Sequence, residues 1–150
     1  MSTAYDLTTQ PLGNSISTDD IVGALEFLDD WEARYAYIID LGKQVPLMPA
    51  DMKTDARIVR GCQSQVWLET RYDPDTQRLW LGIDSDALIV KGLAAMVLAA
   101  YNGKTPAAIL AFDIEALFEK LDLLRHLSQT RGNGLRAMVQ RIQDTARVLA

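Results

Sequence analysis

The sequence predicts an α+β fold in which a small central antiparallel sheet of about three strands packs against several helices. Three observations predict this fold. Apolar residues recur at helical spacing early in the chain, short β-branched stretches follow in the middle, and helical spacing returns in the C-terminal half. The 150 residues show no internal repeat and no linker, which favours a single domain.

The chain is expected to begin with a leader. Residues 1–18 carry no helical or strand periodicity and include Pro11 and Gly13, which predicts an extended segment that frays. The remaining residues, 19–150, are predicted to form the single folded domain.

A long helix is predicted to follow the leader. The hydroxyl and carboxylate groups of Ser17–Asp20 can cap free backbone N–H groups, and helical spacing then continues to Gly42. We expect a bend near Asp29-Asp30. Pro46 and Pro49 predict a loop after this helix.

The middle of the chain predicts the sheet. Residues 57–60 form a short β-branched stretch, and residues 65–72 and 78–83 have the composition of two further strands. The segment 73–77 contains Asp, Pro and Thr and predicts the turn between the last two strands.

A buried helix is predicted over residues 87–100, because this stretch is apolar on nearly every side. We expect Ser85 or Asp86 to cap its first turn. Gly92 within it predicts the close approach of a neighbouring element.

Further helices are predicted toward the C-terminus. Thr105-Pro106 begins a short helix, and the apolar residues between 114 and 121 mark another. The glycines of Arg131–Gly134 predict a break, after which residues 135–148 form a last amphipathic helix.

Composition excludes several classes of protein. The net charge of −5 is wrong for a general nucleic-acid binder, and no apolar stretch reaches the roughly 18 residues of a transmembrane helix. One cysteine and one histidine exclude an intrachain disulfide and any Cys-cluster or two-His metal site, so no metal is expected. The N-terminus lacks a signal-peptide pattern, and we expect a cytoplasmic protein that does not engage a membrane.

Charge is unevenly distributed along the chain. Residues 1–50 hold eight acidic against two basic side chains, whereas residues 101–150 hold five acidic against seven basic ones. If these segments form an acidic face and a basic face, the two faces suit electrostatic docking to another protein, although ordinary solvated surfaces explain the charges equally well. A non-catalytic adaptor that binds a partner through these faces is therefore the alternative function.

Cys62 is the principal candidate for chemistry. It follows Gly61, which permits a positive-φ turn, and it lies between two predicted strands. Arg57 and Arg60 are close in sequence, and nearby cations favour the reactive thiolate. The alternative is that Cys62 is a small buried apolar residue.

Two other sites are less well supported. A cysteine hydrolase would need His126 as its base, but no matching sequence pattern accompanies Cys62. Asp84 and Asp86 could hint at a hard cation, yet no later Glu stands at the spacing that an EF-hand requires, and helix capping explains them better.

Four stretches, in order, resemble the SufE family of sulfur-acceptor proteins, which serve iron–sulfur cluster assembly. They are Trp31–Gly42, Gly61–Trp67, Asp84–Leu93 and His126–Met138. The leader is the main departure from the family pattern. The resemblance implies an α+β fold similar to that of the cluster scaffold proteins, with the cysteine at the tip of a loop.

The resemblance also implies roles for individual residues. Cys62 would accept sulfane sulfur from a cysteine desulfurase and hold it as a persulfide. Residues that would support the cysteine loop are Arg60, Gly61, Gln63 and Ser64. Asp86 and Arg131 match family positions associated with the active loop or with desulfurase binding, although a capping carboxylate and a surface guanidinium explain them equally well.

The partners implied are a SufS-like cysteine desulfurase and a downstream iron–sulfur scaffold complex. The pyridoxal phosphate of the reaction would belong to the desulfurase, so this chain needs no cofactor of its own. The oligomeric state stays open, with a homodimer among the alternatives. Because a persulfide is easily lost, we also expect Cys62 to turn toward an apolar pocket near Trp67 and Leu93 when no partner is bound.

Overall fold

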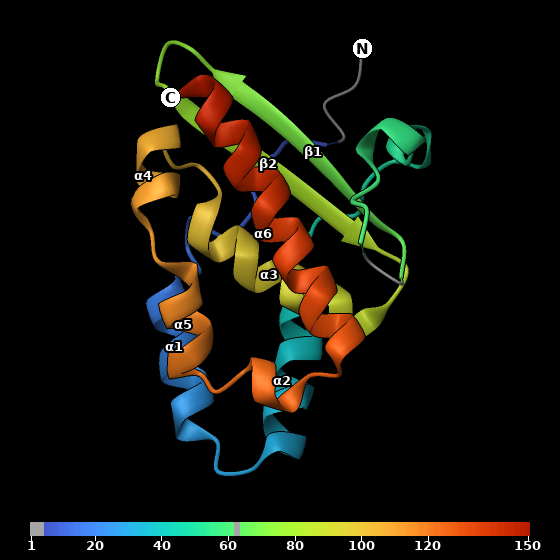
Figure 1. Ribbon diagram of the computed structural model, residues 1–150, viewed down its shortest axis with the longest axis vertical. Helices are drawn as coiled ribbons and strands as arrows, with labels where there is room; N and C mark the ends of the chain where they lie inside the picture. Colours follow the sequence, from blue (N-terminus) through green and yellow to red (C-terminus); the bar gives the residue numbers. More distant parts are fainter. Residues whose placement is uncertain (1–4, 62–63) are drawn as a thin grey trace.

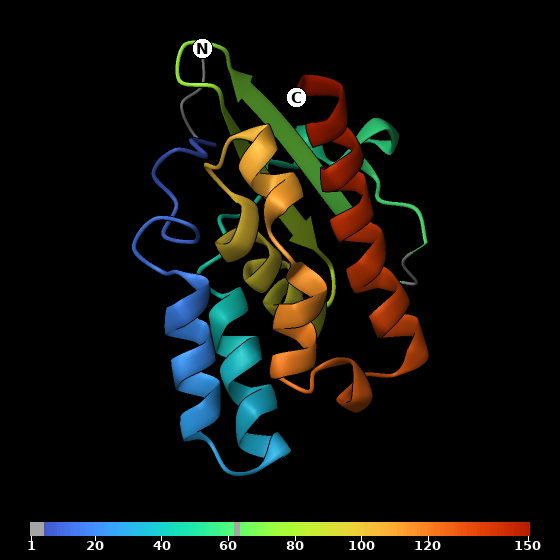
Figure 2. The same ribbon diagram turned by 60° about the vertical axis from the view of Figure 1, so that its left-hand side comes forward.

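The computed structural model describes residues 5–61 and 64–150. Helices and strands follow in the order α1 (Thr18–Phe27), α2 (Trp31–Gly42), η1 (Ala50–Met52), η2 (Asp55–Arg57), β1 (Val66–Asp73), β2 (Arg78–Ser85), α3 (Leu88–Tyr101), α4 (Pro106–Ala111), α5 (Ile114–Lys120), η3 (Leu124–His126) and α6 (Gln129–Leu149). Figure 1 shows α6 running alongside the strand pair, and Figure 2 shows α1 and α2 side by side at the other end of the molecule. The α+β class predicted from the sequence is confirmed.

β1 and β2 form an antiparallel hairpin in which Val66 pairs with Ser85 and Asp73 with Arg78. About three strands were expected, and the described part of the chain forms two. The expected first strand, residues 57–60, contributes only an isolated bridge between Ile58 and Trp67. The preceding residues turn in the 3₁₀ helix η2, and Gly61 reverses the chain, so this segment is too short to continue the ladder.

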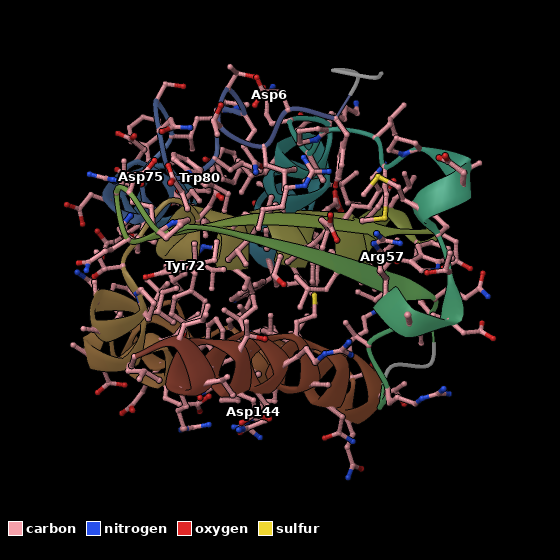
Figure 3. All side chains as sticks on the ribbon, turned by 90° about the horizontal axis from the view of Figure 1, so that it is seen from above. Asp6, Arg57, Tyr72, Asp75, Trp80 and Asp144 are labelled. Carbon is pink, nitrogen blue, oxygen red and sulfur yellow. The ribbon has the colours of Figure 1, made fainter. Side chains whose placement is uncertain are left out.

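The two faces of the hairpin cover different layers. Alternate residues such as Leu68, Leu81 and Ile83 face the main core, which they share with α3 and α6. The opposite face carries Trp67, which belongs to a smaller cluster with Tyr5. Figure 3 shows the hairpin between α6 on one side and the N-terminal segment on the other.

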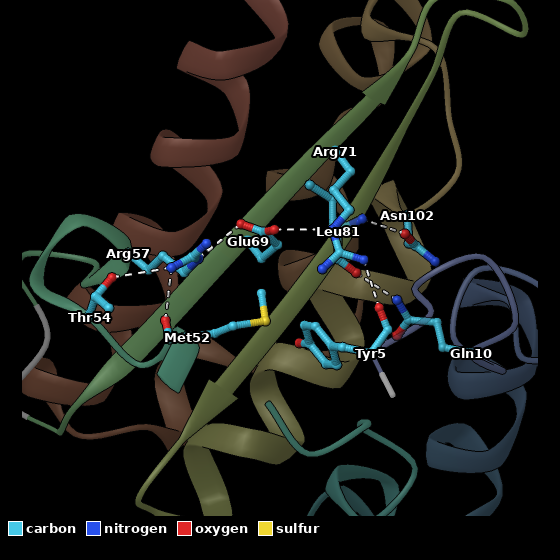
Figure 4. Close-up of polar contacts among 9 residues, drawn as sticks. All are labelled: Tyr5, Gln10, Met52, Thr54, Arg57, Glu69, Arg71, Leu81 and Asn102. Atoms are coloured by element: carbon cyan, nitrogen blue, oxygen red, sulfur yellow. Dashed lines mark hydrogen bonds and ion pairs between the residues drawn. The ribbon is translucent and has the colours of Figure 1, made fainter. Parts of the chain in front are cut away.

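The described part of the leader, residues 5–16, packs against the hairpin. The Gln10 side-chain amide donates to the Leu81 carbonyl at 2.6 Å, and the Asn102 side chain accepts from the Leu81 N–H at 2.8 Å. Asn102 also donates to the Leu12 carbonyl at 3.0 Å. Side-chain amides therefore satisfy the outer edge of β2 at the place where a further strand would pair (Figure 4).

The predicted N-terminal helix is broken, not bent, and the break lies at the expected place. Leu28 is extended after α1, and the Asp30 carboxylate then caps α2 by accepting from the Ala33 N–H at 2.8 Å. A new cap of this kind restarts the helix in another direction.

The predicted break at Arg131–Gly134 is wrong, because these residues lie within α6. Ser128 caps the helix by accepting from the Arg131 N–H, so α6 begins at Gln129, six residues earlier than the sequence pattern suggested. Gly132 and Gly134 are buried in α6, where packing outweighs their poor helix propensity. The cap of α4 by Thr105, with Pro106 in the first turn, is as predicted.

α3 is buried along most of its length, as its apolar sequence predicted. The predicted close approach at Gly92 is confirmed, because a Cβ atom there would overlap the Ile38 carbonyl oxygen of α2. Gly42 of α2 lies against Gly92 in the same way, because a Cβ atom added to Gly42 would lie 2.8 Å from the Gly92 nitrogen. Paired glycines thus allow α2 and α3 to touch backbone to backbone.

We expect the Gly92→Ala variant to lose about 1–3 kcal/mol of unfolding free energy, since α2 and α3 must separate to admit the methyl group. Gly23→Ala is the matched control, because Gly23 also lies within a helix but an added Cβ has no neighbour within 4 Å. That variant should gain about 1 kcal/mol from helix propensity. Urea unfolding measures both changes, and equal stability of the two variants would contradict the close approach.

Candidate functional site

Cys62 and Gln63 lie outside the described residues, but the chain on both sides of them is described. Gly61 has a φ of +93°, which confirms the positive-φ turn predicted there. A Cβ atom on Gly61 would lie 3.4 Å from the Ala137 side chain, so this residue sits against α6. Ser64 is half-buried and lines a pocket. The described residues on both sides of Cys62 and Gln63 therefore lie beside α6.

The pocket next to Ser64 has a volume of about 460 Å³. It lies between α3, α6 and the segment that enters β1. Its lining residues are Ser64, Val90, Leu93, Ser128, Thr130, Arg131, Gly134, Leu135 and Met138.

The lining of the pocket combines two kinds of surface. Aliphatic and thioether groups from α3 and α6 supply apolar contacts, while hydroxyl groups and the Arg131 guanidinium supply polar ones. The expected apolar pocket includes Leu93, as predicted. Trp67 does not line it, because the alternation of β1 turns this side chain to the opposite face, against Tyr5 and Met48.

Asp86 clamps the start of β1. Its Oδ1 accepts from the Gln65 N–H at 3.0 Å, and its own N–H donates to the Gln65 carbonyl at 3.3 Å. The Ser85 hydroxyl donates to the same carbonyl at 2.7 Å. The predicted helix cap by Ser85 or Asp86 is wrong for α3, whose N-cap is Ala87 without a side-chain bond to the helix. Before the helix begins, the Asp86 carboxylate and the Ser85 hydroxyl both bind Gln65. The Ser85 oxygen also accepts from the Ala87 N–H.

Asp84 is the centre of a buried polar cluster at the end of β2. Only 1% of its side chain is exposed, and its carboxylate accepts from the Met48 N–H at 2.9 Å and from the Ser85 N–H at 2.8 Å. The ammonium groups of Lys53 and Lys91 lie 3.6 Å and 3.4 Å from it. These two ammonium groups supply the positive charge that a buried carboxylate requires, in place of a hard cation.

The cations near the cysteine segment differ in their partners. Arg57 is engaged, because it donates to Glu69 at 3.0 Å and also to Met52 and Thr54 (Figure 4). Arg60 and Arg131 are exposed, and within the described ranges neither guanidinium has a hydrogen-bond or ion-pair partner. These two cations are the ones available to a ligand or a partner protein.

His126 is partly buried, as expected. Its ring stacks on Trp31 with 3.9 Å between ring centroids and 14° between planes, and its Nδ1 lies 3.0 Å from the Asp122 carbonyl oxygen. These contacts join the start of α2 to the segment that leads into α6. In residues 5–61 and 64–150, no three His, Cys, Asp or Glu side chains come together in a group that could hold a metal ion.

The buried phenols near the sheet are unsuited to proton transfer. Burial, with a smaller contribution from the negative charge of Asp84, raises the pKa of Tyr5, and burial also raises the pKa of Tyr101. Both hydroxyl groups therefore stay protonated at neutral pH.

Several residues of the site had no local sequence signal that assigned them to it. Met138 was assigned to core spacing in the last helix, and Ser128 was noted only within the stretch that resembles the family. Asp84 was considered as half of a weak cation pattern and within another such stretch. The role of Gln65 depends on a backbone bond to a residue 21 positions away, which no local pattern reports.

The fold and the site define a class: a small α+β domain with one cysteine in its sequence, in which Ser64, two residues after the cysteine, lines a partly apolar pocket. The chain belongs to the SufE family, since the family model described as "Fe-S metabolism associated domain" matches residues 19–146. Involvement in iron–sulfur metabolism follows from this membership. Among the described residues, no helix combines the length and apolar character needed to cross a membrane.

Individual relatives agree with this assignment. An uncharacterized SufE-like protein of Rhizobium etli is 47% identical over 136 residues, covering 89% of this chain and 92% of that protein. Another from Rhizobium meliloti is 46% identical over 132 residues, covering 87% and 94%. The solution structure of a hypothetical protein from Thermus thermophilus has the same fold, with a TM-score of 0.70, 19% identity, and coverage of 88% of this chain and 94% of that one.

We predict that Asp86→Ala frees the Gln65 amide, because the only side-chain acceptor described for it is lost. Hydrogen exchange at Gln65 should accelerate, and the free energy of unfolding should fall by about 1 kcal/mol. Asp86→Asn is the control, since it keeps the Oδ1 acceptor without the charge. Unchanged exchange at Gln65 in the alanine variant would show that the clamp does not hold this segment.

Proposed function

We propose that this protein accepts a sulfur atom from a cysteine desulfurase on Cys62, holds it as a persulfide and delivers it for iron–sulfur cluster assembly. The observation that supports the proposal is the position of the residues on either side of Cys62 and Gln63: Gly61 lies beside α6, and Ser64 lines the pocket. Family membership gives the metabolic context.

The proposed transfer is an exchange between thiolates and divalent sulfur. The Cys62 thiolate attacks the terminal sulfur of the partner's Cys–S–SH group. A new S–S bond forms on Cys62, the S–S bond of the partner breaks, and the partner's cysteine leaves as a thiolate. The proton stays on the transferred sulfur, so charge and atoms balance without an added oxidant or reductant.

The composition of the chain suits a carrier. Cys62 is the only cysteine in the sequence, so no neighbouring thiol of this chain can displace the persulfide and form a disulfide. The chemistry that generates the sulfur would belong to the pyridoxal phosphate of the desulfurase, so this chain acts as an acceptor and not as an enzyme. A cytoplasmic location, where such thiols stay reduced, fits this role.

The pocket has the properties that a stored persulfide needs. Leu93, Leu135 and Met138 offer apolar contacts that would exclude water and soluble oxidants from the outer sulfur. Arg131 at the same pocket would favour the anionic form of the persulfide, and Arg60 would favour the Cys62 thiolate that attacks. After transfer, a downstream scaffold complex would receive the sulfur.

Intact-protein mass spectrometry tests the proposal. The chain is mixed with a SufS-like cysteine desulfurase and L-cysteine, and we expect a gain of one or more sulfur atoms that dithiothreitol removes. The Cys62→Ser variant should fold normally and gain none, because the nucleophile is absent. His126→Gln should gain sulfur as the unmodified chain does, since no base is required of this residue.

Absence of any sulfur gain, with a folded chain and a titratable thiol, would contradict the proposal. Retention of desulfurase stimulation in Cys62→Ser would instead identify the chain as an adaptor. Loss of sulfur acceptance in His126→Gln would assign this histidine to the chemistry.

A further inference from the structure

We infer that Arg141 is a positioning residue for the sulfur transfer, an inference that rests on the proposed function. Its guanidinium ties residues 56–61, which we call the entry stretch, to α6. This helix supplies more than half of the residues that line the pocket. Cys62 follows the entry stretch directly in the sequence, so the tie holds the chain from which the cysteine extends.

Arg141 binds two backbone carbonyl groups at once. One terminal amino group donates to the Ile58 carbonyl at 2.9 Å, and the other donates to the Ala56 carbonyl at 3.1 Å. Both carbonyls lie at the end of η2, where a short helix leaves carbonyl groups without partners of its own. The planar guanidinium presents its N–H groups in a rigid fork, so the two bonds define an orientation as well as a distance.

The chain on both sides of residues 62 and 63 follows one side of α6. The entry stretch meets the helix at Arg141 and again one turn earlier, where a Cβ atom on Gly61 would lie 3.4 Å from the Ala137 side chain. Ser64 lines the pocket together with Gly134. Positions 141, 137 and 134 are spaced by four and three residues, which places them on the same side of an α-helix.

A second set of contacts holds the entry stretch to β1. The Val59 N–H donates to the Val66 carbonyl at 2.8 Å, and the Arg57 guanidinium donates to Glu69 at 3.0 Å (Figure 4). The Val59 side chain is also buried in the main core. These contacts keep the stretch on the hairpin, whereas the bonds from Arg141 set its position relative to α6. Loss of the guanidinium should therefore shift the stretch without unfolding the protein.

The proposed transfer depends on how the thiol is offered to the donor. A thiolate attacks a divalent sulfur in a restricted geometry, and small misplacements of reacting groups lower rates strongly. Because Cys62 is bonded to Gly61, an entry stretch that moves away from α6 offers the cysteine from a wider range of positions. Arg141 thus acts through the backbone, so its loss should slow transfer from a docked donor and leave the intrinsic reactivity of the thiol unchanged.

The first test measures transfer and reactivity separately in the full chain. The sulfur gain on Cys62 is followed over time by intact mass, with increasing amounts of a SufS-like desulfurase loaded from L-cysteine. Arg141→Met keeps the aliphatic stem and loses the donors, and we expect its rate at saturating desulfurase to fall about tenfold or more. The half-saturating concentration should stay the same. Alkylation of Cys62 by iodoacetamide, which needs no oriented partner, should not slow.

Two further variants separate positioning from other effects of the substitution. Arg141→Lys should recover part of the lost rate, because an ammonium group can still donate to one of the carbonyls. Arg147→Met is the matched control on the same helix. The Arg147 guanidinium donates to Asp144 at 2.6 Å and, among the described residues, makes no bond to the entry stretch. This control should transfer sulfur at the unmodified rate.

Hydrogen exchange tests the tie without reference to sulfur. The Ile58 N–H donates to the Asp55 carbonyl at 3.2 Å within the turn that Arg141 holds. In Arg141→Met we expect exchange at Ile58 to accelerate about tenfold or more, while the amides of β2 keep their protection.

The outcomes separate this inference from the proposed function. Unmodified transfer in Arg141→Met, an equal loss in Arg147→Met, no recovery in Arg141→Lys, or a parallel slowing of alkylation would overturn the positioning role. Unchanged exchange at Ile58 would overturn it as well. A lack of sulfur gain in the unmodified chain would instead overturn the proposed function, whereas faster exchange at Ile58 would still show that Arg141 holds the entry stretch.

Discussion

The buried carboxylate of Asp84 is the interaction on which the arrangement of the site depends. A charge removed from water must be paired and hydrogen-bonded, and Asp84 meets this requirement with Met48, Lys53 and Lys91. These partners belong to the loop after α2 and to the first turn of α3. Satisfying one carboxylate therefore closes both segments onto the end of β2.

The residues that follow Asp84 hold the backbone at the start of β1. Ser85 and Asp86 follow Asp84 directly, and both bind the backbone of Gln65 at the start of β1. Gly61 rests against α6 on the other side. The described residues on either side of Cys62 and Gln63 thus lie next to a pocket, an arrangement that would suit the proposed sulfur acceptor because the pocket would shield the product from solvent.

Local patterns predicted those features that local forces decide. The composition of residues 65–72 and 78–83 predicted β1 and β2, the all-round apolar stretch predicted the buried α3, and Thr105-Pro106 predicted the start of α4. Within the site, the positive φ of Gly61 follows from its type, because no other residue adopts that conformation so easily.

Features decided by distant residues were misjudged. Asp86 is a residue type that often caps helices, but its partner Gln65 lies 21 positions away, just before β1. The glycines of α6 have poor helix propensity and therefore predict a break, but their burial keeps them within the helix. Tyr5 in the leader is buried although no periodic pattern of apolar residues surrounds it. In each case tertiary contacts outweigh local propensity, and these contacts are absent from any short stretch of sequence.

The most direct test of this account is residue-resolved hydrogen exchange in the Asp84→Ala variant, which removes both carboxylate acceptors, compared with the unmodified protein at equal global stability. The account predicts faster exchange at Met48 and Gln65, since both amides are held directly or indirectly by the Asp84 carboxylate, with unchanged protection in α4 and in the C-terminal half of α6. Unchanged exchange at Met48 and Gln65 would show that Asp84 does not organise the site.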